Sequence, residues 1–471
     1  MRARLFEPRL AALAFAAAMA GCALQQPPGA SDLHKQALPH TTVPGAWKPA
    51  GVDAKPVVDR WIASFNDPAL SALVDEALTY NADLQAAAAR VEQAGGYLRV
   101  ASASILPSVG LAGLWSGGAS SGGGGLNGIF LNASLEIDVW GRVRYGQAAA
   151  QAQAAAAEAD YTYARQSIAA MVAKSWFVAI EATLQRAIVK DMLTAADDLQ
   201  RLAQDRLRIG NGNEQAVAEA RANAGNYRDA LRQADLAREQ ALRALELLLG
   251  RYPAAEIEVA QRLAAMPPPV PAGLPSQLLE RRPDVIAAER RVAAAFNRVG
   301  EAKAAQLPRI SLTAGGSSIS SDVFVLQDRN NPVWGFGANL FAPLYQGGAL
   351  RAQVDIRNAE QQQAVAAYAS AGQRAFGEVE GALSAEFALG DRALLVDAVV
   401  RDNTRALELA QIQYRVGTID LRAVEQRQLA LYSARTTRLR VQSEQLAQRV
   451  NLHLALGGAF DDAPAVPVAA R

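Results

Sequence analysis

The sequence predicts a mainly α-helical protein whose chain also contributes four strands to a transmembrane β-barrel. Three observations predict this class: long runs without proline, four segments of about ten residues with alternating apolar side chains, and an internal two-fold repeat. Of the 471 residues, 51% are hydrophobic and 20% are charged, which excludes a disordered chain. We therefore expect a folded protein in which long helices dominate.

The amino terminus has the features of an export signal. Arginines precede an apolar stretch that ends at Ala20, and this stretch is too short to span a membrane as a mature helix. Cys22, the only cysteine of the chain, follows at the position where a bacterial lipoprotein signal places its lipidated cysteine. We expect residues 1–21 to be removed as a signal peptide, Cys22 to carry a covalent lipid such as palmitate, and residues 22–61 to form an extended linker.

The internal repeat covers most of the chain. Residues 83–107 match residues 284–308 at a constant offset of 201, and later matches keep an offset of 207. The later pairs are Arg144 and Arg351, Tyr161 and Tyr368, Gln166 and Gln373, and Gly250 and Gly457. Two copies of one unit therefore occupy residues 62–250 and 274–457, with a proline-rich linker at 251–273 and a tail at 458–471.

Each copy is expected to contain a long helical hairpin. No proline lies between Pro107 and Pro253 or between Pro343 and Pro464. Heptad seams run through both arms of the first hairpin, and the seam of the first arm includes Met171, Val178, Met192 and Ala196. Gly210 and Gly417 supply the turns at the hairpin tips, where the backbone needs freedom. The shorter helix before the strands would stack end to end on the returning arm of the hairpin. The predicted helices are about 81–105, 142–208 and 214–249, then 283–306, 348–414 and 421–456.

Two short strands are expected between the helices of each copy. In the second strand, Ile129, Leu131 and Leu135 alternate with polar or small residues, so one face is apolar. Tryptophans near the strand ends favour a membrane strand over the alternative, two half-buried hairpins of a soluble α+β domain. The predicted strands are about 108–117, 128–139, 309–318 and 333–342. The connecting loops, 117–125 and about 320–333, would face one side of the membrane and the helices the other.

Four strands are too few to close a membrane barrel, because the smallest such barrels use about eight. The chain must therefore oligomerise. A dimer would give eight strands around a filled interior, whereas a trimer would give twelve strands and leave room for a lumen.

Composition excludes several function classes. Lys and Arg number 47 against 46 Asp and Glu, so no charge excess indicates a nucleic-acid partner. Three histidines and one cysteine are too few for a zinc site or a disulfide framework. No nucleophile motif indicates catalysis, so we expect no enzyme, no catalytic residues, no metal and no cofactor beyond the lipid on Cys22.

Several motifs in order resemble the outer-membrane factor family, which includes the TolC-like channels and the NodT and OprM type lipoproteins of multidrug efflux systems. The resemblance covers nearly all of the chain after residue 22. The motifs are the lipoprotein start, Phe65-Asn-Asp-Pro-Ala-Leu, Leu135-Glu-Ile-Asp-Val-Trp-Gly-Arg142, Arg281-Arg-Pro-Asp-Val285, Pro343-Leu-Tyr-Gln-Gly-Gly348 and Tyr414-Arg-Val-Gly417.

The resemblance implies a homotrimer with a twelve-stranded β-barrel in the outer membrane and a helical barrel that crosses the periplasm. It implies a lipid-anchored, passive export duct for drugs or other small molecules, with outer-membrane lipids around it. The implied partners are a periplasmic adaptor (membrane fusion protein) and an inner-membrane pump of the RND type. A duct for a type I protein secretion system shares every motif, and a lipid-anchored periplasmic coiled-coil adaptor is the alternative from a different class.

The resemblance also implies a gate at the periplasmic helix tips, built from inward carboxylate rings and polar links. Counting without gaps puts Ala423 and Gln426 at the ring positions, and Ala216 where a linking carboxylate is common. The nearest carboxylates are Asp420 and Glu425, with Arg422 between them, and a one-residue shift would make Glu425 the ring. The alternative is that these are solvated charges on the helix exterior.

Charged residues also flank the strand ends. Glu136 and Asp138 alternate with the apolar set, so we expect them to face the lumen or the periplasmic rim. Arg142, Arg144 and Arg351 follow strand ends, where they would meet lipid phosphate or carboxylates, or remain solvated.

Overall fold

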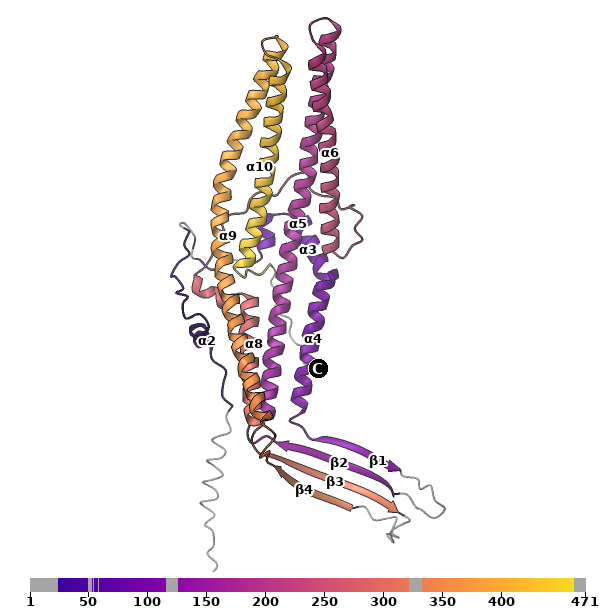
Figure 1. Ribbon diagram of the computed structural model, residues 1–471, viewed down its shortest axis with the longest axis vertical. Helices are drawn as coiled ribbons and strands as arrows, with labels where there is room; N and C mark the ends of the chain where they lie inside the picture. Colours follow the sequence, from indigo (N-terminus) through magenta and orange to yellow (C-terminus); the bar gives the residue numbers. More distant parts are fainter. Residues whose placement is uncertain are drawn as a thin grey trace, which may run out of the picture.

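The structure, a computed structural model, describes residues 24–460 apart from 50–52, 54, 58, 116–125 and 322–332. Helical hairpins form one end of the elongated molecule and a β-sheet forms the other (Figure 1). Several predicted features lie outside the described residues: the signal peptide 1–21, Cys22, the loop 117–125, most of the loop 320–333 and most of the tail 458–471.

The two sequence repeats fold as two copies of one unit. The first contains η1 (Trp61–Phe65), α3 (Pro68–Tyr80), α4 (Ala82–Ala103), β1 (Ser108–Trp115), β2 (Leu126–Ile137), α5 (Arg142–Arg208) and α6 (Glu214–Leu248). The second contains η2 (Pro275–Gln277), α7 (Leu278–Arg281), α8 (Pro283–Ala304), β3 (Arg309–Ser321), β4 (Val333–Phe341), α9 (Ala349–Arg415) and α10 (Leu421–Ala455). All six predicted long helices are present with ends within two residues of the predicted bounds.

The long arms α5 and α9 have 67 residues each, and the returning arms α6 and α10 have 35. The absence of proline from these runs lets the i to i−4 hydrogen bonds continue without a break. At about 1.5 Å per residue, each long arm spans about 100 Å. The α3 helix was not predicted. It begins where the Asp67 carboxylate accepts hydrogen bonds from the N–H groups of Ala69 and Leu70, at 3.0 and 3.2 Å.

The predicted end-to-end stacking is present in both repeats. Asn81 caps α4 by accepting from the Leu84 N–H at 3.1 Å, and its amide donates to the carbonyl of Leu248 at the end of α6, at 2.9 Å. Arg282 occupies the equivalent position of the second repeat and donates to the carbonyl of Ala455 at the end of α10, at 3.1 Å. Each joint thus satisfies an end carbonyl that its helix leaves unpaired.

The α5 helix forms the centre of the structure and packs against α3, α4, α6, α8 and α10. Its Trp176, Phe177 and Ile180 are buried with Leu245 of α6 and Val450 of α10. One stretch of α5 is long and apolar enough to cross a membrane by length and composition, but half of it is buried against other helices. That burial is what a core helix requires.

The predicted heptad seam of α5 is present only in the half of the helix nearer the hairpin tip. There, Met192 and Ala196 pack against Ala224 and Tyr227 of α6. In the half nearer the sheet, the predicted seam residues Met171 and Val178 are 39% and 47% exposed, so the predicted burial of these two residues is wrong. An α-helix drifts by about 20° per heptad from a strict seven-residue repeat, and lower α5 also packs against α3 and α8.

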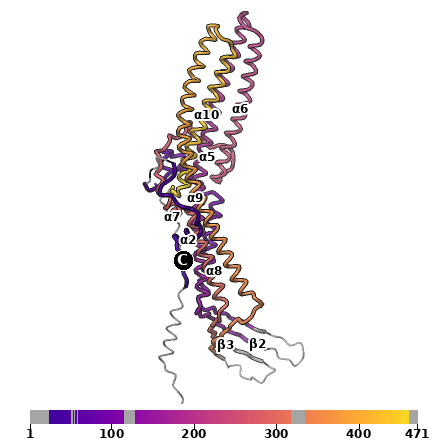
Figure 2. The backbone as a smooth tube through the Cα atoms, turned by 60° about the vertical axis from the view of Figure 1, so that its left-hand side comes forward, coloured from indigo at the N-terminus to yellow at the C-terminus, as the bar shows by residue number. Residues whose placement is uncertain are grey.

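The amino-terminal segment is not a uniformly extended linker, which corrects the prediction for residues 22–61. It contains α2 (Ala30–Ala37), which lies along the outside of α9 (Figures 1 and 2). Leu33 and Leu38 are buried in a cluster with residues of α8 and α9. Further along, the Trp47 indole N–H donates to the carbonyls of Ala272 and Gly273 in the linker between the repeats, at 3.2 and 3.1 Å. Apolar burial therefore explains why this segment follows the body of the protein.

The four strands form one antiparallel sheet in the order β1-β2-β3-β4. The central pair joins the two repeats, with Ile137 opposite Ile310 and Leu126 opposite Ser321. The outer strands, β1 and β4, each pair on one side only among the described residues. The sheet therefore has two open edges.

Candidate functional site

The sheet separates its residues into two chemically different faces. The register places Leu111 beside Leu131 and Gly316 beside Trp334, so these four share one face. That face consists of Val109, Leu111, Ile129, Leu131, Ala133, Leu135, Ile137, Ile310, Leu312, Ala314, Gly316, Trp334, Phe336, Ala338 and Leu340. The opposite face consists of Ser108, Gly110, Ala112, Phe130, Asn132, Ser134, Glu136, Arg309, Ser311, Thr313, Gly315, Gly335, Gly337, Asn339 and Phe341.

The apolar face is exposed to an extent that water does not favour. Phe336 is 93% exposed, and Leu111, Trp334 and Leu340 are also exposed. A continuous apolar surface of this kind marks contact with lipid or with another protein. The indole of Trp334 also covers Gly316, where an added Cβ would lie 2.6 Å from the ring. Glycine is therefore required beneath this tryptophan.

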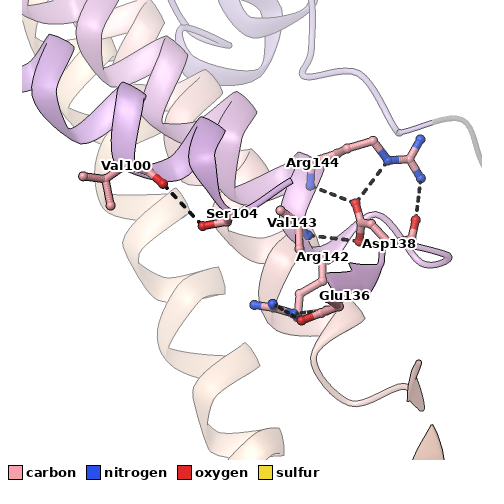
Figure 3. A network of polar contacts seen from close by, with 7 residues as sticks. All are labelled: Val100, Ser104, Glu136, Asp138, Arg142, Val143 and Arg144. Carbon is pink, nitrogen blue, oxygen red and sulfur yellow. Dashed lines mark hydrogen bonds and ion pairs between the residues drawn. The ribbon is translucent and has the colours of Figure 1, made fainter. Parts of the chain in front are cut away.

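Two ion pairs lie where the sheet meets α5 (Figure 3). Arg142 binds Glu136 in a bidentate manner, with N···O distances of 2.9 and 2.6 Å. The Asp138 carboxylate accepts from the N–H groups of Val143 and Arg144, at 3.1 and 2.9 Å, and from the Arg144 guanidinium at 3.1 Å. These bonds satisfy unpaired N–H groups in the first turn of α5 and fix its direction relative to β2.

These contacts test the expectations for the strand-end charges. Arg142 and Arg144 bind carboxylates, as one of the two expectations held. Glu136 lies on the polar face of the sheet, as predicted. Arg351 is exposed and forms no ion pair within the described part of the chain. Trp140 is half-exposed at the same junction, and its indole N–H donates to the carbonyl of Pro308 at 2.7 Å.

At the opposite end of the molecule, each hairpin turns at its predicted glycine. Gly210 and Gly417 have φ values of 78° and 82°, in the left-handed region that favours glycine. Asn213 and Asp420 begin the returning helices by accepting hydrogen bonds from the N–H groups of Ala216 and Ala423, at 2.8 and 3.0 Å. Asp420 thus caps α10, which gives this carboxylate a structural role in the turn.

Two polar links join the hairpins near these tips. The Arg206 guanidinium of α5 donates to the Tyr414 carbonyl of α9 at 2.7 Å and lies 4.1 Å from the centre of its ring. On the other arms, Arg422 of α10 binds Glu219 of α6 at 2.5 Å. We call these two contacts the tip links. The sequence analysis named Arg422 but not its partner, and it did not predict that Arg206 and Tyr414 meet.

Glu425 lies just below the tip links and faces α6. Asn223 hydrogen-bonds its carboxylate, while Oε1 is buried without a partner among the described residues. Burial, and then the nearby negative charge of Glu219, raise the pKa of Glu425 above its usual value. Its carboxylate therefore contacts the neighbouring hairpin of the same chain, rather than standing as a solvated exterior charge.

The described residues offer no group of three or more His, Cys, Asp or Glu side chains placed to hold a metal ion. An amphipathic sheet is connected through two ion pairs to long helical hairpins, and those hairpins are linked to each other at their far ends.

Comparison with known proteins shows which chains have a similar sequence. Residues 73–251 and 274–458 each match the family model described as outer membrane efflux protein. The chain is 31% identical over 409 residues to the cation efflux system protein CusC of Escherichia coli O6:H1, covering 85% of this chain and 88% of the relative. It is 30% identical over 438 residues to the pyoverdine export outer membrane protein OpmQ of Pseudomonas aeruginosa, covering 88% of this chain and 91% of the relative.

Solved structures give the same result. The structure is similar to the open state of the Neisseria gonorrhoeae MtrE outer membrane channel, with a TM-score of 0.77 and 26% identity. The match covers 93% of this chain and 98% of that one.

Proposed function

Since the chain belongs to the outer membrane efflux protein family and is the outer-membrane channel of a tripartite efflux system, we propose that three copies assemble into one continuous duct. The sheets form a twelve-stranded barrel in the outer membrane, and the hairpins form a helical barrel in the periplasm. The observation that carries this proposal is the open sheet with one exposed apolar face, joined directly to the long hairpins.

The open edges require other chains. Backbone groups cannot remain unpaired in lipid, so β1 and β4 must pair with strands beyond the four that the described residues form. Pairing β4 of one copy with β1 of the next satisfies both edges with a single kind of contact. Two copies would give eight strands around a filled interior, whereas three give a lumen wide enough for a solute. The polar face then lines the lumen and the apolar face contacts lipid.

Passage is controlled at the far end by the tip links. Separating the hairpins of one chain breaks the contacts of Arg206 with Tyr414 and of Glu219 with Arg422. The duct itself is passive and performs no chemistry. A periplasmic adaptor and an inner-membrane pump, of the RND type, supply the force and the solute. Among relatives, CusC is named for cations and OpmQ for pyoverdine, so the cargo class proposed for this chain is small molecules.

The alternatives are less favoured. The relatives are efflux channels, which argues against a protein secretion duct and against a periplasmic adaptor. Membrane anchoring by a lipid on Cys22 remains part of the proposal. It is supported by the position of Gln25, whose N–H donates to the Tyr145 hydroxyl at 2.9 Å. Tyr145 lies at the start of α5, next to the sheet, so Gln25 is close to the part of the chain that is proposed to enter the membrane. Replacing Cys22 by serine should remove the mass of the lipid from the mature protein.

Two measurements test the proposal. The complex extracted by detergent from outer membranes should have the mass of three chains, and a monomer released without detergent would refute the barrel. In planar bilayers, Arg422→Ala and Glu219→Gln should raise conductance, because each breaks a link between the hairpins. Arg405→Ala is the matched control, since Arg405 pairs with Glu408 within α9 and joins no hairpins. Equal conductance in all three variants and the wild type would refute the role of this link.

A further inference from the structure

The polar face of the sheet is almost free of charge. The four strands contain only two charged residues, Glu136 and Arg309. Serine, threonine, asparagine and glycine make up most of the rest of this face. Both charged residues lie at the end of the sheet nearest the helices, because Glu136 precedes α5 by a few residues and Arg309 follows α8. Any electrostatic selection by the strands therefore takes place at the base of the barrel.

The carboxylates of Glu136 and Asp138, at the end of β2, are both compensated by arginines. Glu136 forms a bidentate pair with Arg142, and the adjacent Asp138 pairs with Arg144 (Figure 3). Each of these pairs has zero net charge, and each is held by additional hydrogen bonds or a second N···O contact. Their field falls off quickly with distance, because opposite charges a few ångströms apart cancel beyond the pair.

Arg309 is different. It is the first residue of β3 and shares the polar face with Ser311 and Thr313. Its side chain is exposed, and within the described part of the chain it has no carboxylate at ion-pair distance. Its partner across the strands is Phe341, which is 59% exposed on the same face. Of the two charged residues in the described strands, Glu136 is thus paired and Arg309 is the one without an ion-pair partner in the described part of the chain.

We propose that Arg309 from each chain forms a ring of positive charge at the base of the barrel lumen, and that this ring makes the membrane section of the duct favour anionic solutes over cations. The inference rests on the proposed trimeric barrel, which brings the copies around one axis with their polar faces inward. Like charges arranged around a narrow aqueous passage with walls of low dielectric constant reinforce one another. The ring is separated from the tip links by the full length of the hairpins, so the two act independently.

A charge series at position 309 tests this inference. The measured quantity is the ratio of chloride to potassium permeability, taken from the reversal potential of single channels under a KCl gradient near 0.1 M. Arg309→Lys keeps the charge and should keep the wild-type ratio. Arg309→Gln should lower the ratio by about twofold or more, and Arg309→Glu should lower it further. The differences should shrink near 1 M salt, where the screening length falls from about 10 Å to about 3 Å.

The outcomes separate this inference from the proposed function. If Arg309→Gln forms channels of wild-type conductance with an unchanged permeability ratio, the arginine ring has no selective role, although the duct stands. If Arg309→Lys shifts the ratio as much as Arg309→Gln does, shape rather than charge sets it, and the inference is again refuted. If the wild type itself forms no channels, the duct fails together with the ring.

Discussion

His453 makes the docking of the η1 segment sensitive to acid. It lies on α10, is 4% exposed, and stacks on the indole ring of Trp61 with the two ring centres 5.6 Å apart. Its Nδ1 has no hydrogen-bond partner among the described residues. Burial, and then the positive charge of Arg449, lower the pKa of His453 to about 3. The folded protein therefore keeps this imidazole neutral throughout the physiological range.

The size of the effect follows from linkage. When the segment opens, His453 regains a pKa of about 6.5 and takes up a proton below that pH, whereas the closed form does not. The free energy that keeps the segment closed is therefore fully present above about pH 6.5, and it decreases as the pH falls from 6.5 toward 3. At pH 4.5 the loss is about 2.7 kcal/mol, or about 100-fold in the opening equilibrium.

Hydrogen exchange measures this opening directly. Protection of the backbone amides of Trp61–Phe65, corrected for the intrinsic effect of pH on exchange, should fall about 100-fold between pH 7 and pH 4.5 in the wild type. In His453→Leu the proton-binding group is absent, so only the smaller change due to other groups should remain. The same pH dependence in both proteins would refute this account of His453.

Two further predictions concern the tip and the second repeat. Burial, and then the charge of Glu219, raise the pKa of Glu425 in the linked tip, so its protonation as the pH falls below 7 should stabilise the linked tip and lower conductance. This stabilisation is lost as the pH rises through the raised pKa. Glu425→Gln should conduct less at pH 7 and lose that pH response, and a wild-type conductance that rises toward pH 5 would contradict this. Arg282→Ala should lower stability by about 3–5 kcal/mol, since Arg282 is 2% exposed and its loss leaves the half-buried Asp284 carboxylate, the Ala455 carbonyl and the more exposed Glu378 without their partner. Thermal unfolding in detergent measures this, and the double variant with Asp284→Asn, which removes the carboxylate that Arg282 binds in a bidentate manner, should recover part of the loss.

Much of the fold could be predicted because its signals are local. The long helices occupy proline-free runs, and the hairpins turn at glycines with positive φ, so their ends follow from the sequence. The α2 and α3 helices were missed for different reasons. The α3 helix has a local signal, the Asp67 cap before Pro68, that could have been found. The α2 helix is short and depends on burial of Leu33 and Leu38 against residues distant in sequence.

The tip was harder to predict because its contacts join separate hairpins. Arg206 and Tyr414 are 208 residues apart, and Glu219 and Arg422 are 203 apart. Which side chains meet depends on the rotation of each helix about its axis, and a one-residue error turns a helical side chain by about 100°. Counting from Gly417 identified the neighbourhood of Glu425 but could not show that it faces α6.

The two repeats also differ at the tip in a way that has consequences for opening. At the offset of 207, the equivalent of Glu219 is Gln426 and the equivalent of Arg422 is Gln215. The Arg206–Tyr414 link also lacks a charged counterpart, since Arg206 corresponds to Gln413 in the second repeat. Each ion or cation contact therefore has an uncharged counterpart in the other repeat.

It follows that the tip links join a hairpin to only one of its two neighbours in the proposed trimer. In the proposed trimer, hairpins of the two kinds alternate around the axis, and each hairpin has one neighbour in its own chain and one in the next chain. Glu219 meets Arg422 at the interface within a chain, whereas the equivalent positions at the interface between chains need not carry the pair. Half of the interfaces are thus held by these links and half depend on other contacts. A duct built in this way opens in two separable steps, and breaking both tip links should release only the interfaces within chains.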